Sequence, residues 1–238
     1  MNKINAVYVS LAALVLSVVA LVMCIMCCNK EPNVEEVLVN KPEIIAKAMQ
    51  KAEQIQREQA EKEAQKMMQE NAEALYNNAN DGVIGNPEGK VVLVEFFDYS
   101  CGYCHKVYPI LKNVVAKNKD LKIVAKPLAF LSPMSTYAAK ASLAAKEQGK
   151  FAEVYSAIFE IKGKMTEAKI DEAAVLAGAD LDKLKADMES EKVKETMSQV
   201  SDLASKLRVN GVPTLVLNGK IVRTLDEGTL QQAIDAAR

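Results

Sequence analysis

The sequence VVLVEFFDYSCGYCH, at residues 91–105, combines a strand pattern with a Cys-x-x-C motif. Its apolar and β-branched first half predicts a strand, and the residues after Cys101 predict a helix that continues to about residue 117. A turn from strand to helix at this motif places Cys101 at a helix N-terminus, where unpaired N–H groups and the helix dipole favour negative charge. We therefore expect the sulfur of Cys101 to be a thiolate more often than that of a free cysteine.

This arrangement suits thiol–disulfide exchange, because the thiolate attacks disulfides and Cys104, one turn later, can resolve the mixed disulfide. Cys101, Cys104 and His105 also spell C-x-x-C-H, the signature of c-type haem attachment. The strand-like run before the motif argues against haem. A closed zinc site needs four ligands, but the chain has one histidine and no second cysteine pair outside its first thirty residues. A redox dithiol is the first interpretation, haem the second and zinc the third.

Composition narrows the class of protein. The chain has 238 residues with 30 basic and 31 acidic side chains, and no basic stripe interleaved with aromatic residues, so no nucleic-acid partner is expected. Three of the five cysteines, Cys24, Cys27 and Cys28, lie in an N-terminal apolar segment. An exported body that contains only the pair at 101 and 104 has no separate structural disulfide to form, which fits a pair that cycles between redox states.

The N-terminal segment, residues 1–30, is predicted to be a membrane anchor or an export signal. Residues 6–28 carry no charge, and about 23 residues suffice to span a bilayer as a helix. An uncleaved anchor is favoured over a cleaved signal or a lipidated Cys24, because no clear small-x-small cleavage site is present. Positive charge at Lys3 and the amino terminus orients the rest of the chain to the periplasmic side of a bacterial inner membrane.

Residues 31–82 are predicted to form a helical segment. Between residues 42 and 78 the chain is rich in Ala, Glu, Gln, Lys and Met, which predicts one long helix or two consecutive ones. A thin apolar stripe recurs every three or four residues through Ile45, Met49 and Ile55. Periodicity alone allows both a solvated spacer and a weak coiled coil that self-associates.

The remaining residues, 83–238, predict an α/β domain. The strand and helix around Cys101 lead to a second strand at 121–125, which makes a βαβ unit. Residues 132–207 are almost wholly helical in pattern. Gly-Val-Pro-Thr at 211–214 then precedes two short strands joined by an Asn-Gly turn, and a last helix.

This order resembles the thioredoxin fold with an inserted helical domain, as found in the DsbA family, over residues 86–238. EFFDYSCGYC and GVPT carry the resemblance. Within that family the chain is most similar to the suppressor of copper sensitivity protein C group and related disulfide isomerases. In that group the segment corresponding to residues 36–85 makes the protein a trimer, so the resemblance favours a homo-oligomer formed through residues 42–78.

The resemblance implies roles for residues of the motif. Cys101 is the expected nucleophile and Cys104 the buried resolving cysteine. Pro213 is the expected cis-proline facing the sulfur pair, with the Val212 backbone turned outward to pair with an extended substrate. The residues between the cysteines are expected to tune the redox pair. The full set expected to border substrate is Val212, Pro213, Gly102, Tyr103 and His105.

Two further residues enter through the resemblance. Glu95 lies six residues before Cys101, as the buried acid does in DsbA. In a strand covered on both faces its pKa would be raised, and it could take the proton from Cys104; the alternative is a carboxylate that points to solvent at the strand end. Lys126 resembles the lysine that pairs with that acid.

The sequence thus predicts a thiol–disulfide oxidoreductase that needs no cofactor. It would act on cysteine-containing exported proteins with a membrane redox partner, as an isomerase if oligomeric and as an oxidase if monomeric. The alternative is a protein of copper tolerance that binds Cu(I) at Cys101 and Cys104 without turnover, because a reduced dithiol is a soft ligand pair.

Overall fold

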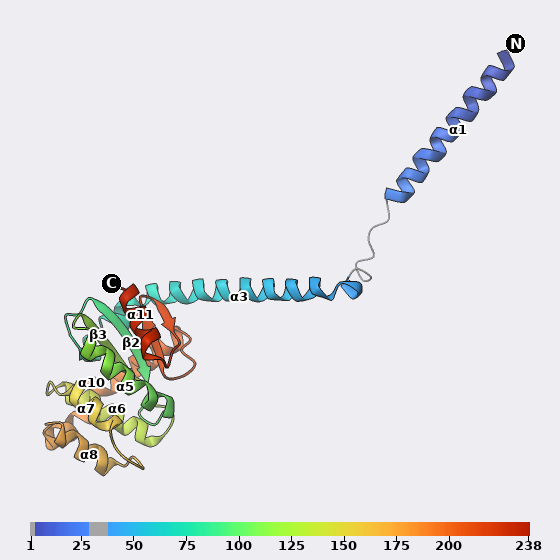
Figure 1. The fold of residues 1–238 in the computed structure, drawn as a ribbon. Helices are drawn as coiled ribbons and strands as arrows, with labels where there is room; N and C mark the ends of the chain where they lie inside the picture. The colour runs from blue at the N-terminus through green and yellow to red at the C-terminus, as the bar shows by residue number, and fades with distance from the viewer. Residues whose placement is uncertain (1–2, 29–37) are drawn as a thin grey trace. The chain divides into compact units, whose positions relative to one another are not determined.

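The computed structural model describes residues 3–28 and 38–238, and describes side chains for residues 13–26 and 38–238 (Figure 1). The chain divides into two compact units, Met1–Gln59 and Ala60–Arg238. The boundary between them falls within the segment predicted to be helical.

The first unit contains α1 (Lys3–Cys28) and the N-terminal part of α3 (Pro42–Glu70). Within the described residues, no helix has the combination of length and apolarity that crossing a membrane requires. The anchor or export signal predicted for residues 1–30 falls partly on residues outside the described ranges and stays a prediction. The expected long helical segment forms two helices, because α3 ends at Glu70 and α4 spans Ala72–Tyr76.

The second unit is built on a five-stranded mixed sheet with the strand order β1-β3-β2-β4-β5. The central pair, β2 and β3, is parallel, as the predicted βαβ unit requires, and the other neighbours are antiparallel. The strands are β1 (Gly82–Gly85), β2 (Val91–Phe97), β3 (Leu121–Pro127), β4 (Thr214–Leu217) and β5 (Lys220–Val222).

The edge strand β1 was not predicted, because its residues read as turn chemistry. Two of its four residues are glycines. Gly82 is required by packing, since a Cβ there would lie 2.0 Å from the Phe151 ring. Gly85 has a φ of +84°, a backbone conformation that residues with a side chain rarely adopt. The strand therefore has few of the β-branched residues by which a strand is recognised.

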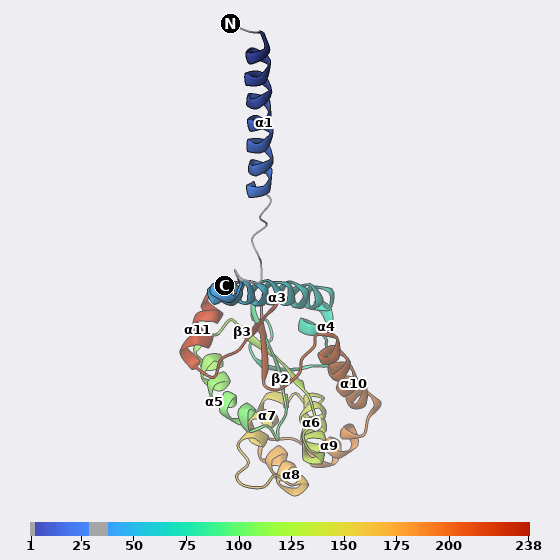
Figure 2. The same cartoon turned by 90° about the vertical axis from the view of Figure 1, so that its right-hand side faces the viewer.

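Helices cover both faces of the sheet (Figure 2). Alternation along β2 sends Leu93 to one face and Val94 and Phe96 to the other. The face of Leu93 packs against α5 (Gly102–Lys117) and α11 (Glu227–Ala236). The face of Val94 packs against α4, α10 (Glu191–Lys206) and the last turns of α3, where Met68 is buried.

The remaining helices lie between β3 and α10 in the chain. They pack with Phe97, Tyr99, Cys104 and Tyr108 into a third apolar cluster, which also contains Tyr155. Inserted helices thus touch the end of β2 and the start of α5, where the cysteine motif lies. They are α6 (Pro133–Lys146), α7 (Phe151–Phe159), α8 (Glu167–Leu176) and α9 (Leu181–Met188).

Candidate functional site

The two cysteines of the motif lie at the start of α5, directly beyond the end of β2. Cys101 is the N-cap residue, and its Sγ accepts a 3.4 Å hydrogen bond from the Cys104 amide. Both cysteines are free thiols. Cys101 keeps 7% of its surface exposed whereas Cys104 is completely buried. Only Cys101 is therefore accessible to a protein substrate. Cys104 can react only with groups inside the protein, such as Cys101.

The loop that contains Pro213 faces Cys101 across 111 residues of sequence. The Val212–Pro213 peptide bond is cis. The Cys101 thiol donates a 3.4 Å hydrogen bond to the Val212 carbonyl oxygen. The structure thus brings together Cys101, Cys104, Val212 and Pro213.

The other residues expected to border substrate divide into two groups. Gly102 is exposed at the first turn of α5, and Tyr103 is 58% exposed beside Pro213 in a shared cavity. His105 faces the inserted helices instead: its Nε2 lies 2.8 Å from the Tyr99 carbonyl oxygen, and its ring meets Phe159 edge-on. The histidine therefore lies beside the dithiol but on the side of the inserted helices.

Glu95 is fully buried in the middle of β2 rather than pointing to solvent. Its Oε2 accepts a 2.8 Å hydrogen bond from the Tyr155 hydroxyl, while its Oε1 has no partner among the described residues. Burial raises the pKa of Glu95 to about 7, and the hydrogen bond from Tyr155 acts in the opposite direction. Such a pKa suits a group that accepts and returns a proton near neutral pH.

The pKa of the Cys104 thiol is also shifted by burial. Burial is the main cause that raises the pKa of its thiol well above the ordinary value, and the nearby Cys101 and the charge of Glu95 raise it further. Cys104 is therefore a neutral thiol at neutral pH and needs a base before it can act as a nucleophile.

The predicted partnership of Lys126 with Glu95 is wrong. In the β2–β3 register Glu95 lies beside Ala125, so Lys126 projects from the opposite face of the sheet. There its Nζ binds the carboxylate of Asp81 and donates a 2.8 Å hydrogen bond to the Ala74 carbonyl. Burial lowers the pKa of Lys126 and raises that of Asp81, and their mutual attraction opposes both shifts. This pair joins the residue before β1 to β3, on the face of the sheet opposite Glu95.

Asp98 and Tyr155 are residues of the site that the sequence reasoning missed. The buried Asp98 carboxylate accepts hydrogen bonds from the Ser100 amide (2.7 Å), the Ser135 hydroxyl (2.6 Å) and the Phe130 and Leu131 amides. Its own carbonyl accepts from the Cys101 amide at 3.0 Å. Asp98 thus ties the cysteine turn to the start of the inserted helices. An acid directly between a buried strand and the motif was the signal for it.

A small cavity of about 240 Å³ opens beside the dithiol. Tyr103, Pro213, Arg223 and Leu225 line it together with residues of β4 and β5. Leu225 is 50% exposed, and Phe130 and Leu131, next to the Asp98 network, are also exposed. Several apolar side chains are therefore exposed near the dithiol, together with the polar Arg223 and Thr224 of the cavity.

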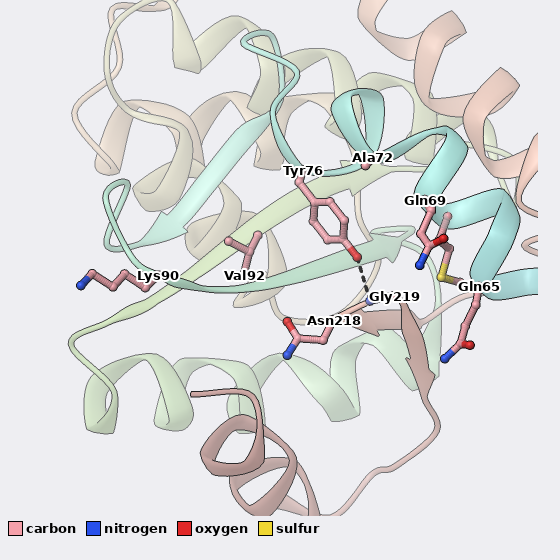
Figure 3. Close-up of a pocket in the computed structure, with 9 residues that line it drawn as sticks. Gln65, Gln69, Ala72, Tyr76, Lys90, Val92, Asn218 and Gly219 are labelled. Carbon is pink, nitrogen blue, oxygen red and sulfur yellow. Dashed lines mark hydrogen bonds between the residues drawn. The ribbon is translucent and has the colours of Figure 1, made fainter.

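A second cavity, of about 390 Å³, lies elsewhere in the same unit (Figure 3). It is formed by the last turns of α3, by Tyr76 of α4, by Val92 near the start of β2 and by the turn between β4 and β5. Figure 3 shows the hydrogen bond from the Gly219 amide to the Tyr76 hydroxyl, which is 2.9 Å long. No residue of the dithiol site lines this cavity.

Comparison with known proteins places this geometry in a family. A family model described as Thioredoxin matches residues 77–236. The chain belongs to the thioredoxin family. The predicted thioredoxin fold is therefore confirmed, as is the resemblance to DsbA-like proteins, because the structural neighbours of this thioredoxin-family chain include ScsC and other thiol–disulfide oxidoreductases.

Two solved structures illustrate the likeness. A thioredoxin-like oxidoreductase from Silicibacter pomeroyi DSS-3 is 36% identical, with a TM-score of 0.65, and the match covers 69% of this chain and 96% of that one. A linker-deletion variant of Proteus mirabilis ScsC is 25% identical, with a TM-score of 0.67, over 86% of this chain and 90% of that one.

The curated relatives that the chain matches differ in how much of their length the match spans. The probable disulfide bond formation protein D of Bacillus cereus is 30% identical to this chain. The match covers 64% of this chain and 76% of the Bacillus protein. The Na(+)/H(+) antiporter NhaA 1 of Mycolicibacterium gilvum is 33% identical over 66% of this chain. That match spans only 27% of the antiporter, so the chain corresponds to about a quarter of such relatives.

Proposed function

We propose that this protein is a thiol–disulfide oxidoreductase that acts on exported, cysteine-containing proteins through Cys101 and Cys104. The observation that carries the proposal is the reduced dithiol at the N-terminus of α5, with Cys101 held 3.4 Å from the Val212 carbonyl of the cis-proline loop. At this position Cys101 Sγ accepts a hydrogen bond from the Cys104 amide, so the sulfur lies against the amide end of the helix.

The exchange has two steps. Cys101 Sγ attacks one sulfur of a substrate disulfide, so that a Cys101–substrate disulfide forms and the other substrate sulfur leaves as a thiolate. Cys104 then gives up its proton and attacks Cys101 Sγ, which forms the Cys101–Cys104 disulfide and releases the second substrate thiolate. Two electrons pass to the substrate, and the reverse sequence oxidises a substrate dithiol.

Glu95 is the proposed acceptor of the Cys104 proton. Both groups are completely buried, and Glu95 lies on the same face of β2 as Phe97, which packs in one apolar cluster with Cys104. A carboxyl with a pKa of about 7 takes up and releases a proton readily at neutral pH. Lys126 is left out of this mechanism because it pairs with Asp81 on the other face.

The substrate is proposed to be an unfolded or partly folded polypeptide. Exposed Tyr103, Phe130, Leu131 and Leu225 offer an apolar surface around Cys101, and the cavity beside Pro213 can receive one side chain. An extended segment could pair with the backbone next to Val212. Because protein disulfides persist in oxidising compartments, we place this activity in the periplasm, with a membrane redox partner that resets the dithiol.

Rescue of scrambled ribonuclease tests the proposal. The full-length protein should restore ribonuclease activity, and Cys101→Ser should reduce that rescue to the uncatalysed background. Cys24→Ser is the matched control, because Cys24 is an exposed cysteine of α1. Equal rescue by wild type and Cys101→Ser would refute the proposed activity. No observation favours Cu(I) binding without turnover, so that alternative stays a prediction.

We also propose that α3 makes the protein a homo-oligomer, with three copies as in the resembled group. Ile45, Met49 and Ile55 of α3 are all exposed, so the predicted stripe is unpartnered in a single chain. Burying such a stripe in a coiled coil removes its apolar surface from water.

Charge substitutions on α3 test the oligomer in the full-length chain. The pair Ile45→Glu/Met49→Glu should lower the solution mass to that of one chain. The control pair Gln50→Glu/Gln54→Glu adds the same charge on another side of the helix and should leave the mass unchanged. An unchanged mass for the first pair, or a monomeric wild type, would remove the proposal.

A further inference from the structure

Tyr155 connects the inserted helices to the buried acid of the dithiol site. It belongs to α7, is 2% exposed, and donates its hydroxyl hydrogen to Glu95 Oε2 over 2.8 Å. The two residues are 60 positions apart in the chain. Within the described residues this is the only side-chain hydrogen bond to the Glu95 carboxyl. The other oxygen, Oε1, has no hydrogen-bond partner there.

The direction of the Tyr155 hydroxyl is fixed by aromatic packing. The Tyr155 ring meets Phe97 edge-on with centroids 5.2 Å apart, and Phe159 edge-on at 4.9 Å. Phe151 stacks against it at 6.1 Å, and Tyr108 lies at 5.9 Å. Contacts on several sides leave the ring little freedom, so its hydroxyl stays directed at Glu95.

The groups that face Glu95 supply no positive charge among the described residues. The groups are Tyr155 from α7, Tyr99 from the loop after β2 and Cys104 from α5. Burial raises the pKa of all three, and the charge of Glu95 raises each pKa further. Lys126 is on the opposite face of the sheet, bound to Asp81. Among the residues that the structure describes, the Tyr155 hydroxyl is therefore the one polar side-chain group that donates a hydrogen bond to the Glu95 carboxylate.

We propose that Tyr155 is a positioning residue for the second step of the exchange, holding Glu95 by Oε2 so that Oε1 is free to accept the proton of Cys104. The proposal rests on the proposed function of Glu95. In this step the proton leaves Cys104 for Glu95, the Cys104 sulfur forms the bond to Cys101 Sγ, and the departing substrate sulfur takes the electron pair of the broken bond. The inserted helices thereby contribute to the chemistry as well as to the shape of the domain.

Stopped-flow reaction of the reduced protein with 5,5′-dithiobis(2-nitrobenzoate) separates the two steps. Attack by Cys101 releases the first thionitrobenzoate, and attack by buried Cys104 on the mixed disulfide releases the second. The full-length chain carries Cys24→Ser, Cys27→Ser and Cys28→Ser in every sample, so that only the dithiol reacts. The rate of the second phase is measured from pH 5 to pH 9.

Tyr155→Phe should leave the first phase unchanged and slow the second phase about tenfold at pH 6, moving its pH midpoint up by about one unit. The reason is that the carboxylate loses a hydrogen bond from a neutral donor, which raises its proton affinity, and one pKa unit is a factor of about ten in base concentration. The two proteins should converge at high pH. In a Glu95→Gln background, Tyr155→Phe should have no further effect on the second phase.

The control is Tyr108→Phe, which removes a hydroxyl from the same aromatic cluster that is bonded to Glu160 rather than to Glu95. Its second phase should follow the wild-type pH profile, and thermal unfolding of both variants reports whether the cluster is intact. A Tyr155→Phe profile that coincides with wild type, while Glu95→Gln slows the second phase, would overturn the role of Tyr155 alone. A second phase unaffected by Glu95→Gln would overturn the role of Glu95 itself, and the role of Tyr155 with it.

Discussion

The stability of the Glu95→Gln variant relative to wild type should rise between pH 4.5 and pH 8. The amide keeps the shape of the carboxyl and can still accept the Tyr155 hydrogen bond, but it carries no charge in either the folded or the unfolded state. Its NH₂ group meets no acceptor where Oε1 now lies, which costs about 1–3 kcal/mol at every pH. The pH dependence of the difference in stability therefore reports the charge alone.

The magnitude follows from the pKa of Glu95. Its folded-state pKa of about 7 lies above the unfolded value of 4.5 because of burial. The folded state thus holds the proton more tightly, and the wild type loses stability as pH rises from 4.5 to about 7. That difference in pKa corresponds to about 3 kcal/mol of folding free energy. The wild type should lose this stability as pH rises, whereas the Glu95→Gln variant should not.

Urea unfolding followed by tyrosine fluorescence measures this effect, since the chain has no tryptophan and several tyrosines surround Glu95. Both full-length proteins are kept reduced and compared at intervals from pH 4.5 to pH 8. Other titrating groups contribute equally to both and cancel. If the stability of the variant relative to wild type stays constant over this range, or falls as pH rises, Glu95 is not a buried carboxyl with a raised pKa.

Two further predictions concern stability away from the dithiol. Asp81→Ala should lower the free energy of unfolding, measured in urea, by about 3–5 kcal/mol, because it leaves Lys126 buried without its counter-charge. The double variant Asp81→Leu/Lys126→Met should recover most of that loss. Equal stability of Asp81→Ala and wild type would contradict the buried pair. Ser190 is the N-cap residue of α10, and its hydroxyl accepts a hydrogen bond from the Val193 amide. Ser190→Ala should therefore lower the free energy of unfolding by about 1 kcal/mol and leave ribonuclease rescue unchanged. A loss of rescue in Ser190→Ala would mean that α10 does more than support the sheet.

Asp98 and Tyr155 connect the sheet with the inserted segment at the site in different ways. Asp98 fixes the backbone of the cysteine turn through hydrogen bonds to residues 130, 131 and 135. Tyr155 reaches the acid beneath the cysteines. One connection sets the position of Cys101, and the other acts on the protonation of the group that we propose deprotonates Cys104.

The amino-acid sequence alone determined the strand, the cysteine turn and the helix of residues 91–117, because these depend on local periodicity and on a sulfur at a helix N-cap. It also placed Glu95 in a buried strand, since the residues around it are apolar without alternation. The partners of its charged residues were decided by tertiary structure. Lys126 and Glu95 lie on neighbouring strands, but the β2–β3 register places them on opposite faces, so Asp81 binds the lysine and Tyr155, from a distant helix, binds the acid. Strand alternation is visible in a sequence, whereas the register between strands and the helix that covers each face arise only when the chain packs.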